Sequence, residues 1–296
     1  MKNFRKFIRF FSPESIKSIA RTDLEGKTVG IDGNFWLYQI MCSMKSSNVK
    51  YFNIYNQDIT HIYGFYKRIN SLLQLNVKPI FVFDGVPPSL KRDTIMKRLD
   101  NKKNSYKRLK NEEFSTMREK KKLVQNSVYI TKEIIKDCKI LLDSLNIPYI
   151  QSVQESDSQL AFLYQNKTIE YIITDDLDIF IFGGNHILPF FKSRNKDFTV
   201  IDISTLSEKL KLSRLDLIKI SILLGNDYTD TFFRGDLKDF FEYKIQNEKI
   251  FEDEKNLEII NYYQNVDKQV KHISLSRNAL KNLNIYNNIN INRFII

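Results

Sequence analysis

The sequence has few cysteines and no long apolar stretch, and both absences narrow what the chain can be. Its 296 residues include only two cysteines, Cys42 and Cys138, which lie far apart and form no Cys-x-x-Cys spacing. We therefore expect neither a disulfide framework nor a zinc knuckle, and we expect a reducing compartment. The longest apolar runs, such as residues 80–83 and 179–182, are far shorter than the roughly 18 residues that a membrane span requires. An integral membrane protein is not expected.

The sequence also lacks a secretory signal, an internal repeat and a flexible interdomain linker. Residues 1–11 mix Lys and Arg with Phe instead of separating a basic region from an apolar one, so a first helix is expected here. The 42% of hydrophobic and 27% of charged residues are typical of a folded globular protein. A chain of this length predicts one large α/β domain or two small ones.

Positive charge is present in excess, and most of it lies in one segment. The chain has 46 Lys and Arg against 35 Asp and Glu, a net charge of +11, and residues 91–122 alone contribute +8. This segment contains no Gly or Pro, which predicts helix. Basic residues interleaved with Tyr106, Phe114 and Tyr129 are typical of an element that binds single-stranded nucleic acid. The alternative is a solvated, charge-laced helix.

The rest of the chain alternates between strand and helix patterns. Strands are expected at residues 28–31, 80–83, 147–150 and 171–173, and helices at residues 35–44, 58–75, 131–145 and 158–164. This alternation predicts an α/β protein with a mainly parallel central sheet flanked by helices. After Ile187 we expect a hairpin with its turn at residues 192–197. A helical part follows, including residues 206–211 and 214–224.

Six acidic residues stand where the predicted strands end or the next helices begin: Asp32, Asp84, Glu155, Asp157, Asp176 and Asp178. A seventh candidate, Asp227, follows the helix that ends at residues 223–225. Any one of them is explained as a helix N-cap, but the carboxyl ends of parallel strands share one edge of a sheet, where seven carboxylates would repel one another. Divalent cations with oxygen ligands, Mg²⁺ or Mn²⁺, would neutralise them, and their number indicates two or more ions. Two such ions can hydrolyse a phosphodiester, so the pattern predicts a nuclease.

Seven short motifs occur in a fixed order, and five of them carry these acids. They are Val29-Gly30-Ile31-Asp32, Phe81-Val82-Phe83-Asp84-Gly85-Val86-Pro87-Pro88, Val128-Tyr129-Ile130-Thr131-Lys132, Ile147-Pro148-Tyr149, Glu155-Ser156-Asp157, Thr174-Asp175-Asp176-Leu177-Asp178 and Leu223-Leu224-Gly225-Asn226-Asp227-Tyr228. The ordered set resembles the flap endonucleases of the structure-specific 5′-nuclease superfamily over residues 26–228. The resemblance implies a nuclease core with a PIN-like 5′-nuclease fold at residues 1–228. It also implies a basic helical arch at about 89–127. The C-terminal part at 229–296 is expected to be helical and to diverge from the family.

The resemblance further implies roles for individual residues. It makes the seven acids the metal ligands. Lys91 and Arg98 match two cations that stabilise the scissile phosphate, and they lie two helical turns apart on one face. Tyr38 matches an aromatic residue that stacks on the nucleotide at the cleavage point, the alternative being a core tyrosine. Three later basic residues are expected to bind the substrate strand: Lys120, Lys121 and Lys122.

Three features depart from the family pattern. The usual Met-Gly start is replaced by Lys2-Asn3, and residues 229–236 lack the Gly-x-Gly of a duplex-gripping helix-hairpin-helix element. The C-terminal residues 293–296 are no match for the motif that binds a sliding clamp. We therefore expect duplex DNA to be anchored differently here.

The predicted function is structure-specific hydrolysis of branched DNA with 5′ flaps by two-metal-ion catalysis. The protein is expected to be a monomer that binds DNA with a 5′ single-stranded flap or end. It is expected inside the cell, in the nucleus or another site of DNA replication. One alternative is a 5′-exonuclease or junction-cleaving relative, and another is a non-catalytic nucleic-acid-binding protein on the same scaffold. A nucleotide-binding α/β enzyme is disfavoured, because the chain has no Gly-x-x-x-x-Gly-Lys loop.

Overall fold

The computed structural model describes residues 3–189, 191–192 and 195–272. Lys2 and the C-terminal residues 293–296, on which two sequence observations rest, lie outside this range, as do parts of the expected turn at 192–197. At the centre is a parallel sheet with the strand order β4-β3-β2-β5. Its strands are β2 (Thr28–Asp32), β3 (Lys78–Phe83), β4 (Tyr149–Gln151) and β5 (Tyr171–Ile173). The parallel sheet predicted from the sequence is confirmed.

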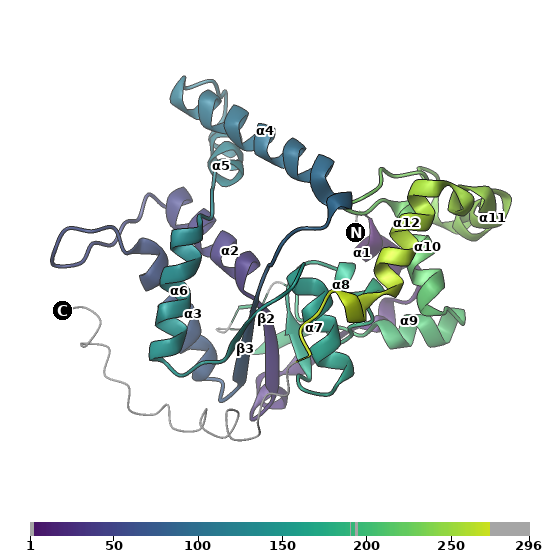
Figure 1. Cartoon of the computed structure of the whole chain (residues 1–296), viewed down its shortest axis with the longest axis horizontal. Coiled ribbons are helices and arrows are strands. Elements are labelled where there is room, and N and C mark those ends of the chain that lie inside the picture. The colour runs from purple at the N-terminus through teal and green to yellow at the C-terminus, as the bar shows by residue number, and fades with distance from the viewer. Residues whose placement is uncertain (1–2, 190, 193–194, 273–296) are drawn as a thin grey trace.

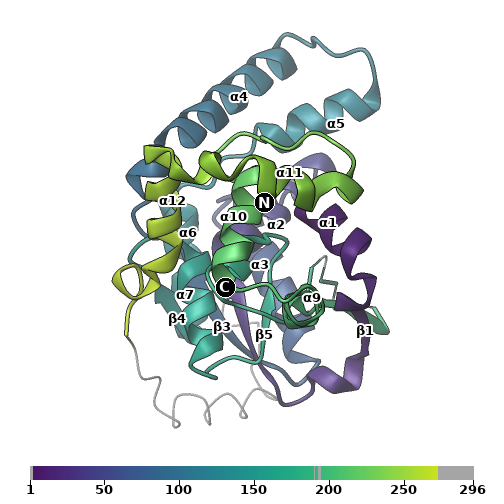
Figure 2. The same cartoon turned by 90° about the vertical axis from the view of Figure 1, so that its right-hand side faces the viewer.

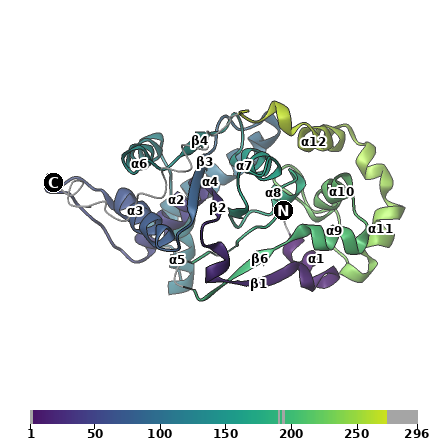
Figure 3. The same cartoon turned by 90° about the horizontal axis from the view of Figure 1, so that it is seen from below.

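Helices cover both faces of this sheet (Figure 3). One face carries α2 (Gly33–Ser46), α3 (Thr60–Leu73) and α6 (Lys132–Ser144), and the other α7 (Ser156–Gln165), α8 (Asp178–Ile181) and α10 (Arg214–Leu224). Alternate residues of a strand point to opposite faces. Phe81 and Phe83 of β3 therefore join a core with Trp36, whereas Ile80 and Val82 join a second core with Leu160.

The N-terminal region combines an expected helix with an unexpected strand. Helix α1 (Phe4–Phe11) forms as predicted, but β1 (Ile16–Ala20) follows it and pairs antiparallel with β6 (Asp197–Ile201). An antiparallel bridge joins Ile187 to Ile201, with backbone hydrogen bonds of 3.0 and 2.8 Å, so the expected hairpin after Ile187 is found at this one position. As a strand, β6 instead takes β1 from the start of the chain as its partner. The long sequence separation hides this pairing from local patterns.

The basic segment is helical, but it forms two helices instead of one. Helix α4 (Arg92–Lys110) and helix α5 (Met117–Asn126) run side by side and stand out from the sheet (Figure 2). The chain reverses at residues 111–116, where Glu112 adopts a left-handed backbone with φ of 56°. The Thr116 side chain caps α5 by accepting a hydrogen bond from Glu119 N at 3.1 Å. Arg108 pairs with Glu119 at 2.5 Å, so the two legs of the arch are tied together.

The C-terminal helices share a core with the sheet. Helix α9 (Ile203–Leu210) leads into α10, and α11 (Phe240–Gln246) and α12 (Glu254–Gln264) follow. The Phe7 and Phe240 rings lie 5.0 Å apart, so α1 packs against α11. Short 3₁₀ turns occupy Pro13–Ser15, Arg21–Leu24, Ser89–Lys91, Leu237–Asp239, Glu248–Glu252 and Val266–Lys268. Across the described ranges, every helix is too short or too polar to cross a membrane.

Candidate active site

A cavity of about 380 Å³ opens at the carboxyl edge of the central sheet. Six of the seven predicted acids line it, and we call it the acid cavity: Asp32, Asp84, Glu155, Asp157, Asp176 and Asp227. The seventh, Asp178, is buried at the start of α8, where its backbone N–H donates to Asp176 Oδ1 at 2.9 Å. The structure therefore brings together residues that span nearly 200 positions of the chain.

Strand ends and helix starts hold these acids in position. Asp32 is the last residue of β2 and the N-cap of α2, because its Oδ1 accepts a hydrogen bond from Phe35 N at 2.9 Å. Asp84 follows β3, and its Oδ1 accepts from Ser156 N at 2.9 Å, at the first turn of α7. Asp32 is therefore a helix N-cap, and it lines the acid cavity as well.

The carboxylates of the acid cavity disfavour one another's charge. Burial, followed by repulsion from Asp84 and Asp176, raises the pKa of the Asp32 carboxyl to about 8. Burial, followed by the charges of Asp176 and Asp32, raises the pKa of Asp157 well above its ordinary value. Burial is also the largest cause that raises the pKa of Asp178 to about 6. A positive counter-charge beside these acids would favour their ionised forms.

The donor chemistry of the cavity fits a hard divalent cation. Asp157 Oδ1 is buried and accepts no hydrogen bond from any described residue, although a buried oxygen normally has a partner. The side chains at the strand ends offer carboxylate oxygens, which suit Mg²⁺ or Mn²⁺. Within the described ranges, no three acidic, His or Cys side chains converge enough to enclose an ion by themselves.

The two predicted cations reach the acid cavity from the start of the arch. Lys91 Nζ contacts the Glu155 carboxylate and lies 2.8 Å from Asp227 Oδ2. Arg98 Nη2 donates to both oxygens of Asp227 at 2.8 Å. Burial alone would lower the pKa of the Lys91 ammonium, but Glu155 and Asp227 raise it far above its usual value. Lys91 therefore carries a fixed positive charge beside the acids.

Tyr38 lines the acid cavity and is not a core tyrosine. Its hydroxyl donates to the Gln125 carbonyl at the end of α5 at 3.2 Å, and burial raises its pKa to about 12. The later lysines lie elsewhere: Lys120, Lys121 and Lys122 are all exposed on α5. The Lys120 ammonium sits 5.1 Å from the centre of the Phe114 ring. The substrate contacts of these four residues stay a prediction.

Four residues near the acids were not predicted from the sequence. Asn34 Oδ1 accepts from Asp84 N at 3.3 Å, and the Tyr228 hydroxyl donates to the Glu155 carboxylate. Both lie within two residues of a predicted acid, so proximity to Asp32 and Asp227 could have indicated them. Two tyrosines of α12 also donate to acids, and no local pattern marks them: Tyr262 and Tyr263.

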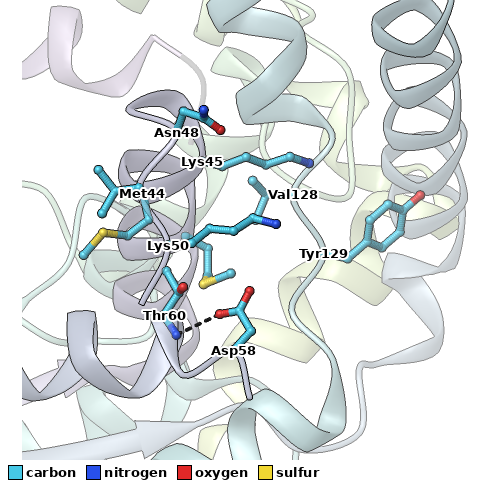
Figure 4. A pocket seen from close by; sticks show the side chains of 10 residues that line it. Met44, Lys45, Asn48, Lys50, Asp58, Thr60, Val128 and Tyr129 are labelled. Atoms are coloured by element: carbon cyan, nitrogen blue, oxygen red, sulfur yellow. Dashed lines mark hydrogen bonds between the residues drawn. The ribbon is translucent and has the colours of Figure 1, made fainter. Parts of the chain in front are cut away.

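A second pocket, of about 280 Å³, lies between the end of α2 and the segment that follows α5 (Figure 4). Its wall combines Met44 and Val128 with the ammonium groups of Lys45 and Lys50. The acid that lines it, Asp58, already accepts a hydrogen bond from Thr60 N at 3.0 Å. This pocket lacks a cluster of carboxylates, so the acid cavity is the candidate for metal chemistry.

Comparison with known families matches both motif-bearing halves of the core. The XPG N-terminal domain matches residues 1–105, and the XPG I-region matches residues 146–227. Residues 229–296, which were expected to depart from the family, lie outside both matches.

Curated relatives agree with these matches. Flap endonuclease 1 of Methanocaldococcus jannaschii is 30% identical over 231 residues, which cover 76% of this chain and 69% of that protein. The chain belongs to the flap endonuclease family. Flap endonuclease 1 of Methanosphaera stadtmanae is 29% identical over 290 residues, covering 95% of this chain and 85% of that protein. The chain spans about half the length of some relatives, such as 48% of Flap endonuclease 1 of Theileria parva, to which it is 30% identical.

Solved structures share the fold. The catalytic core of Rad2 in complex with DNA substrate superposes with a TM-score of 0.63 at 25% identity, covering 94% of this chain and 92% of that one. Flap endonuclease-1 from Methanococcus jannaschii gives a TM-score of 0.65 at 24% identity, with the same coverage. The predicted α/β 5′-nuclease fold and the family resemblance are confirmed.

Proposed function

We propose that this flap endonuclease family member is a structure-specific 5′-nuclease that hydrolyses phosphodiester bonds of branched DNA. One observation carries the proposal: the acid cavity opens beside two cations, Lys91 and Arg98, at the foot of a basic helical arch. A polyanion cannot approach bare carboxylates, but it can approach them through a positively charged element. The related Rad2 catalytic core was solved with DNA substrate, which supports DNA as the polymer.

The acids of the cavity, together with Asp178, are the proposed ligands of two or more Mg²⁺ ions, which Mn²⁺ would replace. When bound, these ions would polarise the scissile phosphate and lower the pKa of a bound water. The chain itself contributes the oxygen ligands, and the partnerless Asp157 Oδ1 supports this assignment. No other buried carboxylate oxygen of the described residues lacks a hydrogen bond in the same way.

Lys91 and Arg98 are proposed to stabilise the reacting phosphate. Both now pair with Asp227, so a phosphate entering the cavity would exchange with this carboxylate for the same donors. The Arg98 side chain is 56% exposed and open to such an exchange, whereas Lys91, at 14%, is fixed by its partners. Positive charge held where negative charge develops lowers the barrier without costly reorganisation.

The substrate is proposed to be DNA with a 5′ single-stranded flap or end. The exposed lysines of α5 would track its phosphates, and Tyr38 would stack on the nucleotide at the cleavage point. The proposed biological setting is DNA replication and repair, by a monomer in a reducing compartment. Nothing in the residue pattern indicates a sliding-clamp partner.

A 5′-exonuclease or junction-cleaving relative is the second candidate. It is favoured by the segment after Tyr228, where residues 230–236 form a loop without a Gly-x-Gly turn before Leu237–Asp239. Duplex DNA must then be held by other contacts, and the preferred branch geometry depends on them.

The test is cleavage of labelled 5′-flap, nicked, gapped and four-way DNA with Mg²⁺, with mapping of the cut. We expect cleavage near the base of the 5′ flap, abolished by EDTA and restored by Mg²⁺ or Mn²⁺. Preferential cutting of the four-way substrate would favour the second candidate. Full activity in EDTA, or binding without any cleavage, would refute the metal mechanism.

A further inference from the structure

We propose that Tyr262 and Tyr263 are positioning residues for the acid cavity. They lie on α12, outside both family matches, and their hydroxyl groups hold Glu155 and Asp178. The inference rests on the proposed function, because it concerns two of the proposed metal ligands. It gives the divergent C-terminal part a role in the chemistry of the core.

The contacts place one tyrosine on each acid. Tyr262 Oη donates to Glu155 Oε2 at 3.1 Å, next to the Tyr228 hydroxyl on the same oxygen. Tyr263 Oη donates to Asp178 Oδ2 at 3.2 Å, and both of these side chains are buried. A phenol is a neutral donor at neutral pH, so it orients a carboxylate without removing the negative charge that a metal requires.

Both tyrosines are fixed in backbone and ring. The Tyr263 carbonyl accepts from Arg214 Nη2 at 2.5 Å, while Arg214 Nε donates to the Ile181 carbonyl at 2.9 Å. The Tyr262 carbonyl accepts from Gln269 Nε2 at 2.5 Å. Through Arg214, α12 is tied to α10 and to the end of α8, and α12 packs beside α10 (Figure 1).

The rings are packed as firmly as the backbone. The Tyr263 ring lies 4.8 Å from the Phe182 ring, and the Tyr262 ring lies 5.4 Å from the Tyr228 ring. Neither hydroxyl can therefore move without displacing a packed ring.

The segment after α12 is hydrogen-bonded to α7. Gln159 of α7 donates from Nε2 to the Lys271 carbonyl at 3.1 Å, and its Oε1 accepts from Lys271 N at 2.7 Å. This helix carries Asp157 in its first turn, so α7 and the C-terminal part are coupled at a second point. Hydrogen-bonding partners of metal ligands typically change metal affinity or activity 10–100-fold when they are removed.

The test removes only the two hydroxyl groups, in Tyr262→Phe, Tyr263→Phe and the double variant. Direct Mn²⁺ binding to the DNA-free protein is measured by electron paramagnetic resonance, and the Mg²⁺ half-saturation by single-turnover cleavage. We expect the double variant to bind Mn²⁺ about 10-fold more weakly and to need correspondingly more Mg²⁺. Tyr243→Phe is the control, since its hydroxyl donates to a backbone carbonyl, that of Phe232, at 3.4 Å.

The possible outcomes are distinguishable. Wild-type Mn²⁺ affinity and Mg²⁺ half-saturation in the double variant would overturn the inference. If Tyr262→Leu is impaired while the Phe variants match the wild type, packing of the ring and not the hydroxyl group positions the acid, and the inference is overturned as well. Loss of the near-ultraviolet circular dichroism in the buried Tyr263→Phe variant would show that its tertiary packing has failed. The Mn²⁺ affinity of the half-buried Tyr262→Phe variant then tests the inference alone. A wild-type protein that neither binds Mn²⁺ nor cleaves DNA would instead refute the proposed function.

Discussion

Asp32 serves the fold and the proposed chemistry with one side chain. Its backbone closes β2 and its Oδ1 caps α2, which fixes where the helix begins. Gly85, in the next motif, also sets the local geometry beside an acid, because an added Cβ there would lie 2.2 Å from the Ser152 carbonyl oxygen. Only glycine allows the chain after Asp84 to approach that backbone so closely. Single residues of the motifs therefore set local geometry and the position of an acid together.

Lys91 is the residue whose removal best tests the site. In Lys91→Ala we expect the single-turnover cleavage rate to fall about 100-fold or more, with a much smaller change in DNA affinity, because the lost interaction is strongest in the transition state. Rapid-quench cleavage and a binding titration measure the two effects. Lys107→Ala, which changes an exposed lysine on α4, the helix that Lys91 precedes, is the matched control. Equal effects of both variants, confined to affinity, would remove Lys91 from the active site.

At the scale of elements, the arch is held by its ends and by few buried contacts. Within α4 and α5 only Ser105 and Leu123 are buried, so neither helix is stabilised by a core of its own. In place of such a core, the arch is stabilised by the cap at the start of α5, by the ion pair between the two helices and by their side-by-side packing. The Tyr38 hydroxyl adds a contact with the end of α5. Such an element keeps its charges exposed to a substrate.

The exposed lysines of α5 should affect binding and not the chemical step. Replacing Lys120, Lys121 and Lys122 together by Gln should weaken binding of flap DNA and flatten its salt dependence, by about 0.7 in log–log slope for each lost phosphate contact to a single strand. Affinity measured across a salt series tests this. The control replaces three lysines at the opposite edge of the sheet by Gln: Lys27, Lys78 and Lys167. An unchanged salt slope in the α5 variant would show that these lysines do not contact the substrate.

For the molecule as a whole, the acids that the proposed function requires lower the stability of the folded protein. Folding brings together carboxylates that the unfolded chain keeps apart and hydrated, so their charge is disfavoured in the folded state. Two cores and the C-terminal helices hold them in place against this repulsion. Bound cations would relieve it, and the free energy of unfolding should then depend on both pH and metal.

We predict that the metal-free protein becomes less stable as the pH rises from 5 to 8. The folded pKa of Asp32, about 8, lies above its ordinary value of 3.8, so its contribution is present at low pH and lost as the pH rises through this window. One pKa unit corresponds to about 1.4 kcal/mol, so the loss reaches a few kcal/mol and the Tm falls by several degrees. Groups with lowered pKa, such as Asp216 at about 2, lose stability only in more acidic solution.

Thermal unfolding in EDTA at the two pH values measures this change. Asp32→Asn should flatten the pH dependence, and Mg²⁺ at pH 8 should restore the Tm of the wild type. A metal-free wild type that is equally stable at pH 5 and pH 8 would contradict the prediction.

The sequence alone determined the parallel sheet, most of its helices and the identity of the acids. Buried parallel strands are short apolar runs, and their helices follow within a few residues, so local patterns suffice for β2, β3 and α6. Asp32 closes β2 and Asp84 directly follows β3, so the order of strands and acids along the chain already predicted a common edge. The break of the basic segment into α4 and α5 was missed, because no Gly or Pro marks it.

Only the tertiary structure decided what joins distant parts of the chain. The pairing of β1 with β6 joins residues about 180 positions apart, and the bond from Tyr262 to Glu155 spans 107 positions. Contacts of this kind depend on how whole elements pack, and no periodicity or spacing within a segment records them. The same reason explains why Lys91 could be placed near the acids by resemblance, whereas its bridge between Glu155 and Asp227 could not. The sequence supplies the chemical groups, and packing decides which of them meet.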